Sequence, residues 1–125
     1  MMWNKSKRIM PFIGAKDYEQ SRKFYSELGF EVGEGEKYCE VKVNDELGFW
    51  LQKYYHKGWV NNSMIFLEIP DVELWEKELL AKELHLKYKY VRFTEIKTFD
   101  WGRELFMHDP SGILWHFCEL NKENK

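Results

Sequence analysis

The sequence predicts an α+β fold of two tandem βαβββ modules that form a curved mixed sheet around a cleft. The order of strand, helix and three strands occupies about residues 1–60 and returns over about 61–120. Each repeat also opens with a strand running into an aspartate-capped helix, in FIGAKDYEQS and FLEIPDVELW. Units of about 60 residues are marginal alone. We therefore expect both to share one core in a single domain, residues 1–125.

The helix of the first module carries the clearest signals. Asp17 is a typical N-cap and Gln20 is its reciprocal partner, while Gly29 provides a C-terminal stop. The apolar stripe between them comprises Tyr18, Ser21, Phe24, Tyr25 and Leu28. These features predict a helix over residues 17–28. Around it we expect strands at 9–15, 38–43 and 47–54, extended chain at 30–32 and a loop at 55–62.

In the second module, Asp71 is expected to cap a helix that runs to about residue 84. Its buried stripe would comprise Val72, Trp75, Leu79 and Leu80. A strand at 64–69 precedes this helix, and extended chain at 90–99 follows it. Strands at 103–108 and 113–119 flank a DPSG sequence with the chemistry of a type I turn.

The pairing of this last hairpin decides which side chains share a face. If His108 pairs with Ile113, then Leu105 pairs with His116. One face then holds Arg103, Leu105, Met107, Leu114, His116 and Cys118. The other, helix-covered face holds His108, Trp115 and Phe117. A slip of one residue would change the cross-strand partners.

The composition excludes several classes of protein. Lys and Arg total 19 against 21 Asp and Glu, so the net charge is -2. The chain therefore lacks the excess of basic residues that is typical of nucleic-acid-binding proteins. No apolar run is long enough to span a membrane, and the N-terminus does not read as a signal peptide. The two cysteines, Cys39 and Cys118, form no disulfide framework, so we expect a reduced, cytoplasmic protein.

Aromatic residues are unusually abundant. The chain has 6 Trp, 7 Tyr and 9 Phe, or 22 rings in 125 residues. Each ring needs roughly 150–250 Å² of cover. A domain this small has limited interior, so we expect some rings to line a cleft or a subunit interface.

Three stretches resemble the vicinal-oxygen-chelate superfamily, which includes glyoxalase I, extradiol dioxygenases and the fosfomycin- and bleomycin-resistance proteins. They are DYEQSRKFYSELGF at 17–30, FLEIPDVE at 66–73 and WGRELFMHDPSGILWHF at 101–117. The third is similar to the closing hairpin of the bleomycin-resistance branch. The resemblance implies the glyoxalase/bleomycin resistance fold. It also implies an antibiotic-like ligand and a homodimer with grooves at its interface, sometimes with exchanged N-terminal strands.

The same resemblance places the ligand positions of the family's metal enzymes on Met10, Trp50 to Gln52, Met64 and His116. Only His116 and Gln52 offer suitable donors there, whereas a catalytic site needs about three protein ligands and an open position. We therefore expect no metal, no cofactor and no catalytic residues, and a protein that binds a small molecule instead of transforming it. The alternative is a divergent metal-dependent lyase or dioxygenase that uses a divalent metal on His116 and Gln52. A third reading is a sensor or a partner subunit without chemistry.

The resemblance to the bleomycin-resistance branch implies a long, cationic ligand with flat heteroaromatic rings, and a cleft for such a ligand needs aromatic faces and carboxylates. Our candidate ligand-binding residues are Trp101, Tyr38, Trp59, Phe66, Trp50, His116, Arg103 and Glu36. For each strand ring the competing interpretation is packing in the core. For His116 it is a core histidine bonded to a backbone carbonyl, and for Glu36, with Glu34 and Glu40, it is a solvated loop.

Overall fold

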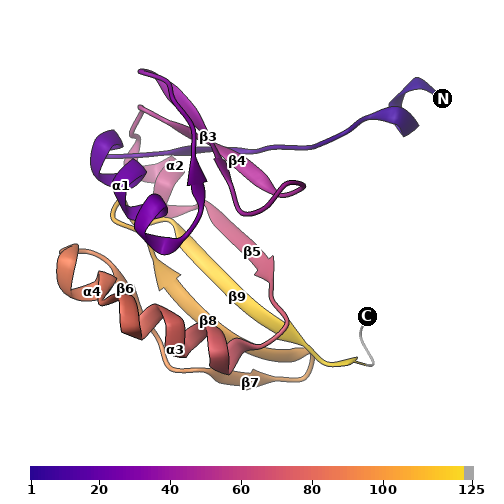
Figure 1. The fold of residues 1–125 in the computed structure, drawn as a ribbon, viewed down its shortest axis with the longest axis vertical. Helices are drawn as coiled ribbons and strands as arrows, with labels where there is room; N and C mark the ends of the chain where they lie inside the picture. Colours follow the sequence, from indigo (N-terminus) through magenta and orange to yellow (C-terminus); the bar gives the residue numbers. More distant parts are fainter. Residues whose placement is uncertain (123–125) are drawn as a thin grey trace.

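The computed structural model describes residues 1–122 and contains one sheet in each half of the chain (Figure 1). Sheet A has the order β1 (Phe12–Gly14), β4 (Gly48–Gln52), β3 (Tyr38–Lys42) and β2 (Glu31–Val32). Sheet B has the order β5 (Met64–Glu68), β9 (Leu114–Leu120), β8 (Gly102–His108) and β6 (Arg92–Phe93), and β7 (Lys97–Phe99) also pairs with β8. The first strand of each module runs parallel to the last, β1 with β4 and β5 with β9. The α+β fold of two βαβββ-type modules is therefore confirmed.

One long helix accompanies each sheet, and both begin at the predicted aspartates. The Asp17 carboxylate accepts a hydrogen bond from the Gln20 N–H at 3.0 Å at the start of α1 (Tyr18–Leu28). All five predicted stripe residues of α1 are buried. The Asp71 carboxylate caps α3 (Val72–Lys82) in the same way through the Leu74 N–H. These helices form because their caps and apolar spacing agree.

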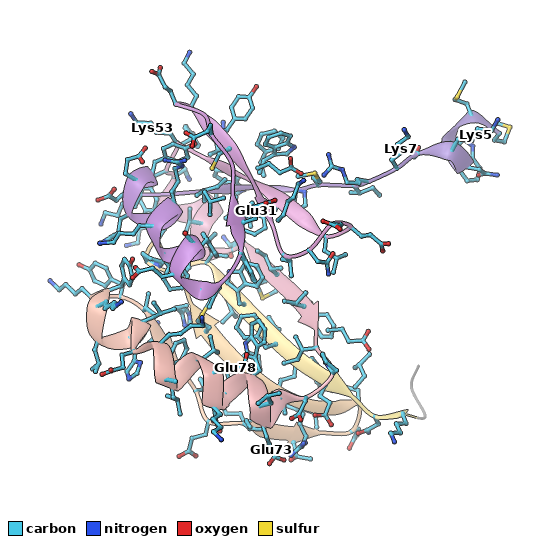
Figure 2. The ribbon with its side chains drawn as sticks, in the orientation of Figure 1. Lys5, Lys7, Glu31, Lys53, Glu73 and Glu78 are labelled. Atoms are coloured by element: carbon cyan, nitrogen blue, oxygen red, sulfur yellow. The ribbon has the colours of Figure 1, made fainter. Side chains whose placement is uncertain are left out.

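Several predicted elements differ from the structure in their extent. The strand expected at 9–15 is only β1. Ile9 is 95% exposed on an N-terminal arm that projects from the body and carries a 3-10 turn at Met2–Lys5 (Figure 1). Pairing with β4 starts only where the Pro11 carbonyl accepts from the Trp50 N–H, because proline itself has no N–H to donate. Lys5 and Lys7 lie along this arm (Figure 2).

In the second module, the predicted helix to about residue 84 ends at Lys82. Glu83 takes a left-handed conformation with φ 54°, and a separate helix α4 (Leu84–Lys87) follows. Leu80 is 49% exposed instead of buried, because Val72 and Leu79 already fill the stripe that faces the core. Trp75 is half-buried and packs against Phe117 at 4.9 Å between ring centroids.

The segment predicted as a loop at 55–62 also contains a helix, α2 (Lys57–Asn61). Its cap is the His56 ring, whose Nδ1 accepts from the Trp59 N–H at 3.4 Å. Histidine is not a common capping residue, so the usual signal for a helix start was missing.

A buried polar network joins the two modules within one shared core. The Tyr25 hydroxyl of α1 donates to Asp109 Oδ2 at 2.6 Å and accepts from the Trp115 indole N–H at 3.0 Å. Asp109 Oδ1 accepts the N–H groups of Ser111, Gly112 and Ile113. Burial raises the pKa of Asp109 to about 6, against the lowering effect of these hydrogen bonds. The turn that closes the second module is thus anchored to the helix of the first.

Candidate ligand-binding site

Each sheet has one face that packs into the core and one open face. In sheet A the core face carries Ile13, Cys39, Val41, Phe49 and Leu51, all buried. Side chains alternate along a strand. The intervening residues therefore point to the open face, where they include Phe12, Tyr38 and Trp50.

These three rings form an aromatic cluster, called cluster A below. Phe12 stacks on Trp50 with centroids 6.0 Å apart, and Tyr38 meets Trp50 edge-on at 5.6 Å. Register places Phe12 and Glu40 on either side of Trp50. Glu40 forms an ion pair with Arg8 of the N-terminal arm. Tyr38 is 50% exposed, so cluster A presents apolar surface to solvent.

The closing hairpin of sheet B is shifted by one residue from the predicted pairing. His108 pairs with Leu114, Leu105 with Phe117 and Phe106 with His116. The shift arises because the Asp109 N–H bonds to the Ile113 carbonyl, and Gly112 turns the chain at φ 103°. The prediction that Arg103, Leu105 and Met107 share a face with His116 was therefore wrong. The core face holds Leu105, Met107, Trp115 and Phe117, and the open face holds Glu104, Phe106, Leu114, His116 and Cys118.

A second aromatic cluster, cluster B, lies on this open face and comprises Phe99, Trp101, Phe106 and His116. Phe99 and Trp101 stack with centroids 4.7 Å apart and planes 2° from parallel. Phe106 meets His116 edge-on at 4.9 Å and Phe99 at 6.3 Å. Phe66 of β5 pairs in register with His116 and is 52% exposed.

Glu104 underlies cluster B and was not among the predicted site residues. It is buried, and its two oxygens hold two members of the cluster. Oε2 accepts from the Trp101 indole N–H at 2.7 Å, and Oε1 lies 3.0 Å from His116 Nδ1. The available signal was its place in the WGRE motif, but the assumed register turned Glu104 away from His116. His116 is partly exposed and bonds this carboxylate, so the interpretation as a core histidine on a backbone carbonyl was wrong.

Of the eight predicted ligand-binding residues, the structure brings Tyr38 and Trp50 together on sheet A and pairs Phe66 with His116 on sheet B. Trp101, in the turn between β7 and β8, is linked to His116 through Glu104. Glu36 is exposed in a bend before β3. Trp59 packs from α2 against Tyr54 at 5.7 Å and covers Gly14, where a Cβ would lie 2.6 Å from the indole.

Arg103 lies on the side of β8 opposite to Glu104. There it pairs with Glu73 of α3 at 2.6 Å and with Glu119 at 3.4 Å. Arg103 was therefore wrongly placed on the face of His116. Glu73 is seen on α3 in Figure 2.

The two weak metal candidates are on different sheets, Gln52 on sheet A and His116 on sheet B. Within residues 1–122, no three His, Cys, Asp or Glu side chains gather in a group suited to a metal ion. The described helices include none long and apolar enough to cross a membrane.

A largely apolar groove of about 660 Å³ runs along the seam between the modules. Its walls come from the β3–β4 hairpin and from β5, and the arm contributes Ile9 and Pro11. Phe66 lines this groove and also lies on the open face of sheet B, opposite His116. The groove therefore adjoins that open face. The volume lies within the usual range for small-molecule pockets, about 300–1,000 Å³.

This arrangement of two βαβββ modules is the glyoxalase/bleomycin resistance fold. No family model and no curated protein matches the sequence. Among solved structures, the bleomycin-binding protein of Streptomyces verticillus, in complex with copper(II)-bleomycin, superposes with a TM-score of 0.77 over 94% of this chain and 98% of its own, at 21% identity. The bleomycin resistance determinant of transposon Tn5 gives a TM-score of 0.76 over 93% and 99%, at 15% identity. An antibiotic-binding protein of Streptomyces sp. CB03234 gives 0.72 over 94% and 98%, at 16% identity.

Proposed function

We propose that this chain is a metal-free binding protein that sequesters flat, cationic, antibiotic-like molecules of the bleomycin type. The observation that carries the proposal is the pair of aromatic clusters on the open faces of the two sheets. Three structural neighbours are described as bleomycin-binding, bleomycin-resistance or antibiotic-binding proteins. Sequestration requires contact surface and charge, and no bond has to be broken.

The chemistry of the two clusters suits such a ligand. Rings in cluster A and cluster B offer faces on which heteroaromatic groups can stack, each contact adding about 0.5–1.5 kcal/mol beyond the area it buries. Sheet B also places carboxylates on its open face, with Glu104 beneath the rings and Glu68 on β5. A positively charged tail is attracted by these carboxylates and by the ring faces.

The proposal includes a homodimer, because in the monomer each cluster forms only one side of a cleft. Tyr38, Phe66 and Trp101 are about half exposed, as are several apolar side chains near the seam. A second copy would cover this surface and set sheet A of one chain against sheet B of the other, which closes a cleft between the clusters. The projecting arm, with exposed Met1, Met2 and Trp3, supplies a segment that can reach the second copy.

The first experiment measures binding of metal-free bleomycin by tryptophan fluorescence and calorimetry. We expect quenching with micromolar or tighter affinity, and a loss of about 10-fold in Trp101→Ala and in Tyr38→Ala. Tyr90→Ala is the matched control, because Tyr90 is 54% exposed and lies outside both clusters. No binding of the wild-type protein rejects a bleomycin-type ligand.

Light scattering tests the assembly. The chain weighs 15.3 kDa, so a dimer gives about twice that mass. A monomeric mass at all concentrations would contradict the proposed cleft between two copies, whatever the outcome of the binding experiment.

A further inference from the structure

An ion pair beside cluster A holds the base of the N-terminal arm. Arg8 Nη1 lies 2.5 Å from Glu40 Oε2, and the Arg8 side chain is 42% accessible to solvent. On the N-terminal side of Arg8 the arm projects from the body, and two of its backbone hydrogen bonds stay within residues 1–6 (Figure 1). An ion pair this exposed contributes little to stability and is readily exchanged for another. Arg8 therefore occupies Glu40 without being fixed there.

Glu40 is the carboxylate that lies directly beside the rings of cluster A. It points to the open face of sheet A, pairs in register with Trp50 and keeps 22% of its side chain accessible. The Trp50 ring in turn stacks on Phe12 with centroids 6.0 Å apart. At the far end of β3, Glu31 of β2 has a cation of its own sheet nearby, because Lys42 lies 3.9 Å from it. The positive charge next to Glu40 comes from the arm instead.

Arg8 brings to this place the chemistry of a flat, cationic ligand. A guanidinium is planar and permanently charged, and it presents its N–H groups in a rigid fork that matches a carboxylate. An amidinium attached to an aromatic ring offers a similar planar cation, together with a ring that can stack on Trp50. Because Arg8 has no ring, such a molecule can form both the ion pair and the ring contacts, whereas Arg8 forms only the ion pair.

We propose that Glu40 is the cation-binding position of cluster A, and that Arg8 fills it until an aromatic amidinium or guanidinium displaces the arm. This inference rests on the proposed function, which makes cluster A a ligand-binding surface. A neutral aromatic molecule uses the rings and leaves the ion pair in place. A cationic one has to compete with Arg8. Arg8 thereby determines specificity, since it weakens the binding of cations whose ring contacts do not compensate for the lost ion pair.

The test compares benzamidine with benzamide, its neutral counterpart of the same shape, in titrations followed by nuclear magnetic resonance at the Trp50 indole N–H. In Arg8→Gln we expect the affinity for benzamidine to rise about 3- to 5-fold and the affinity for benzamide to stay unchanged. Glu40→Gln should remove the preference for benzamidine over benzamide. Lys7→Gln is the matched control, because it removes the same charge from the adjacent, exposed residue of the arm (Figure 2). Circular dichroism confirms that each variant is folded.

Equal benzamidine affinity in the wild type and Arg8→Gln would overturn the proposal. An equal rise in Lys7→Gln would also overturn it, because the effect would then come from the charge of the whole arm. A rise for benzamide as large as that for benzamidine would show that Arg8 blocks the rings by its bulk, and no benzamidine binding in any variant would show that Glu40 receives no cation. Bleomycin binding tests the proposed function separately, so its failure is distinguishable from the failure of this inference.

Discussion

The open faces of sheet A and sheet B both carry aromatic clusters, but they are supported differently. In cluster A, Phe12, Tyr38 and Trp50 touch one another, and the neighbouring Glu40 is paired with the N-terminal arm. In cluster B, the buried carboxylate of Glu104 holds both Trp101 and His116 by hydrogen bonds.

The two clusters therefore differ in how firmly their rings are held in one orientation. Rings that only touch one another can adjust to many ligands, because several stacked and edge-on arrangements have similar energies. Rings that are hydrogen-bonded to a buried carboxylate keep one geometry, because leaving that carboxylate without partners is costly. We infer that cluster A supplies adaptable surface and cluster B the fixed reference point. Four predictions test the comparison, from the largest expected effect to the smallest.

The strongest perturbation breaks the network that joins the sheets. Asp109→Ala leaves three N–H groups and the Tyr25 hydroxyl without their acceptor in the core. We expect a loss of about 3–5 kcal/mol in the free energy of unfolding. Urea denaturation followed by circular dichroism and tryptophan fluorescence measures it. Because the modules share one core, both probes should give one transition, and two separate transitions would show that the sheets unfold independently.

The same aspartate makes stability depend on pH. Burial raises the pKa of Asp109 from 3.8 to about 6, so the folded state binds its proton more tightly than the unfolded state does. The associated stability is fully present below about pH 4 and is lost as the pH rises through 6, by about 2–3 kcal/mol. Urea denaturation between pH 4 and 7 checks this. Other carboxylates titrate in both proteins, so the difference between wild type and Asp109→Asn isolates the effect. If the difference in unfolding free energy between the two proteins stays constant from pH 4 to 7, Asp109 is not the source of the pH dependence.

The two carboxylates of the open faces give a direct comparison. Glu104→Gln weakens the support of cluster B, and we expect bleomycin affinity to fall about 10-fold, or about 1.4 kcal/mol. Glu40→Gln breaks only a partly exposed ion pair. We therefore expect the free energy of bleomycin binding to change by no more than about 1 kcal/mol. Calorimetry on both variants makes the measurement. Equal losses would mean that the two clusters do not differ in the way inferred above.

Much of the fold could be predicted from local signals, whereas the face of the last hairpin could not. Asp17, Asp71 and Gly29 mark helix ends through their own chemistry, and the repeated order of elements gives the two modules. Along β8 and β9, however, apolar residues occupy both faces, as in Leu105-Phe106-Met107. Periodicity therefore cannot choose between registers. The choice is made by the hydrogen bonds of Asp109 and by Gly112, which are tertiary features.

The same limit explains what was found and missed at the candidate site. Tyr38, Trp50, Phe66 and Trp101 were chosen as candidates from their residue type, and Trp101 and Tyr38 also from the family resemblance; neither basis depends on register. Glu104 could be recognised only once its face was known, because a glutamate on a strand is ordinarily exposed. Its burial follows from contacts with Trp101 and His116.

The smallest effect is expected at Arg103, the neighbour of Glu104 on β8. Its guanidinium faces α3, where it pairs with Glu73 and Glu119, and Glu119 also accepts from the Val72 N–H at the start of that helix. Since the side chains of Arg103, Glu73 and Glu119 are 35%, 66% and 30% exposed, Arg103→Ala should cost no more than about 1 kcal/mol of stability. Bleomycin affinity should be unchanged, because the side chain points away from cluster B. Urea denaturation and calorimetry on one variant measure both quantities. A drop in affinity without a drop in stability would place Arg103 in the cleft and contradict the register of the hairpin on which cluster B depends.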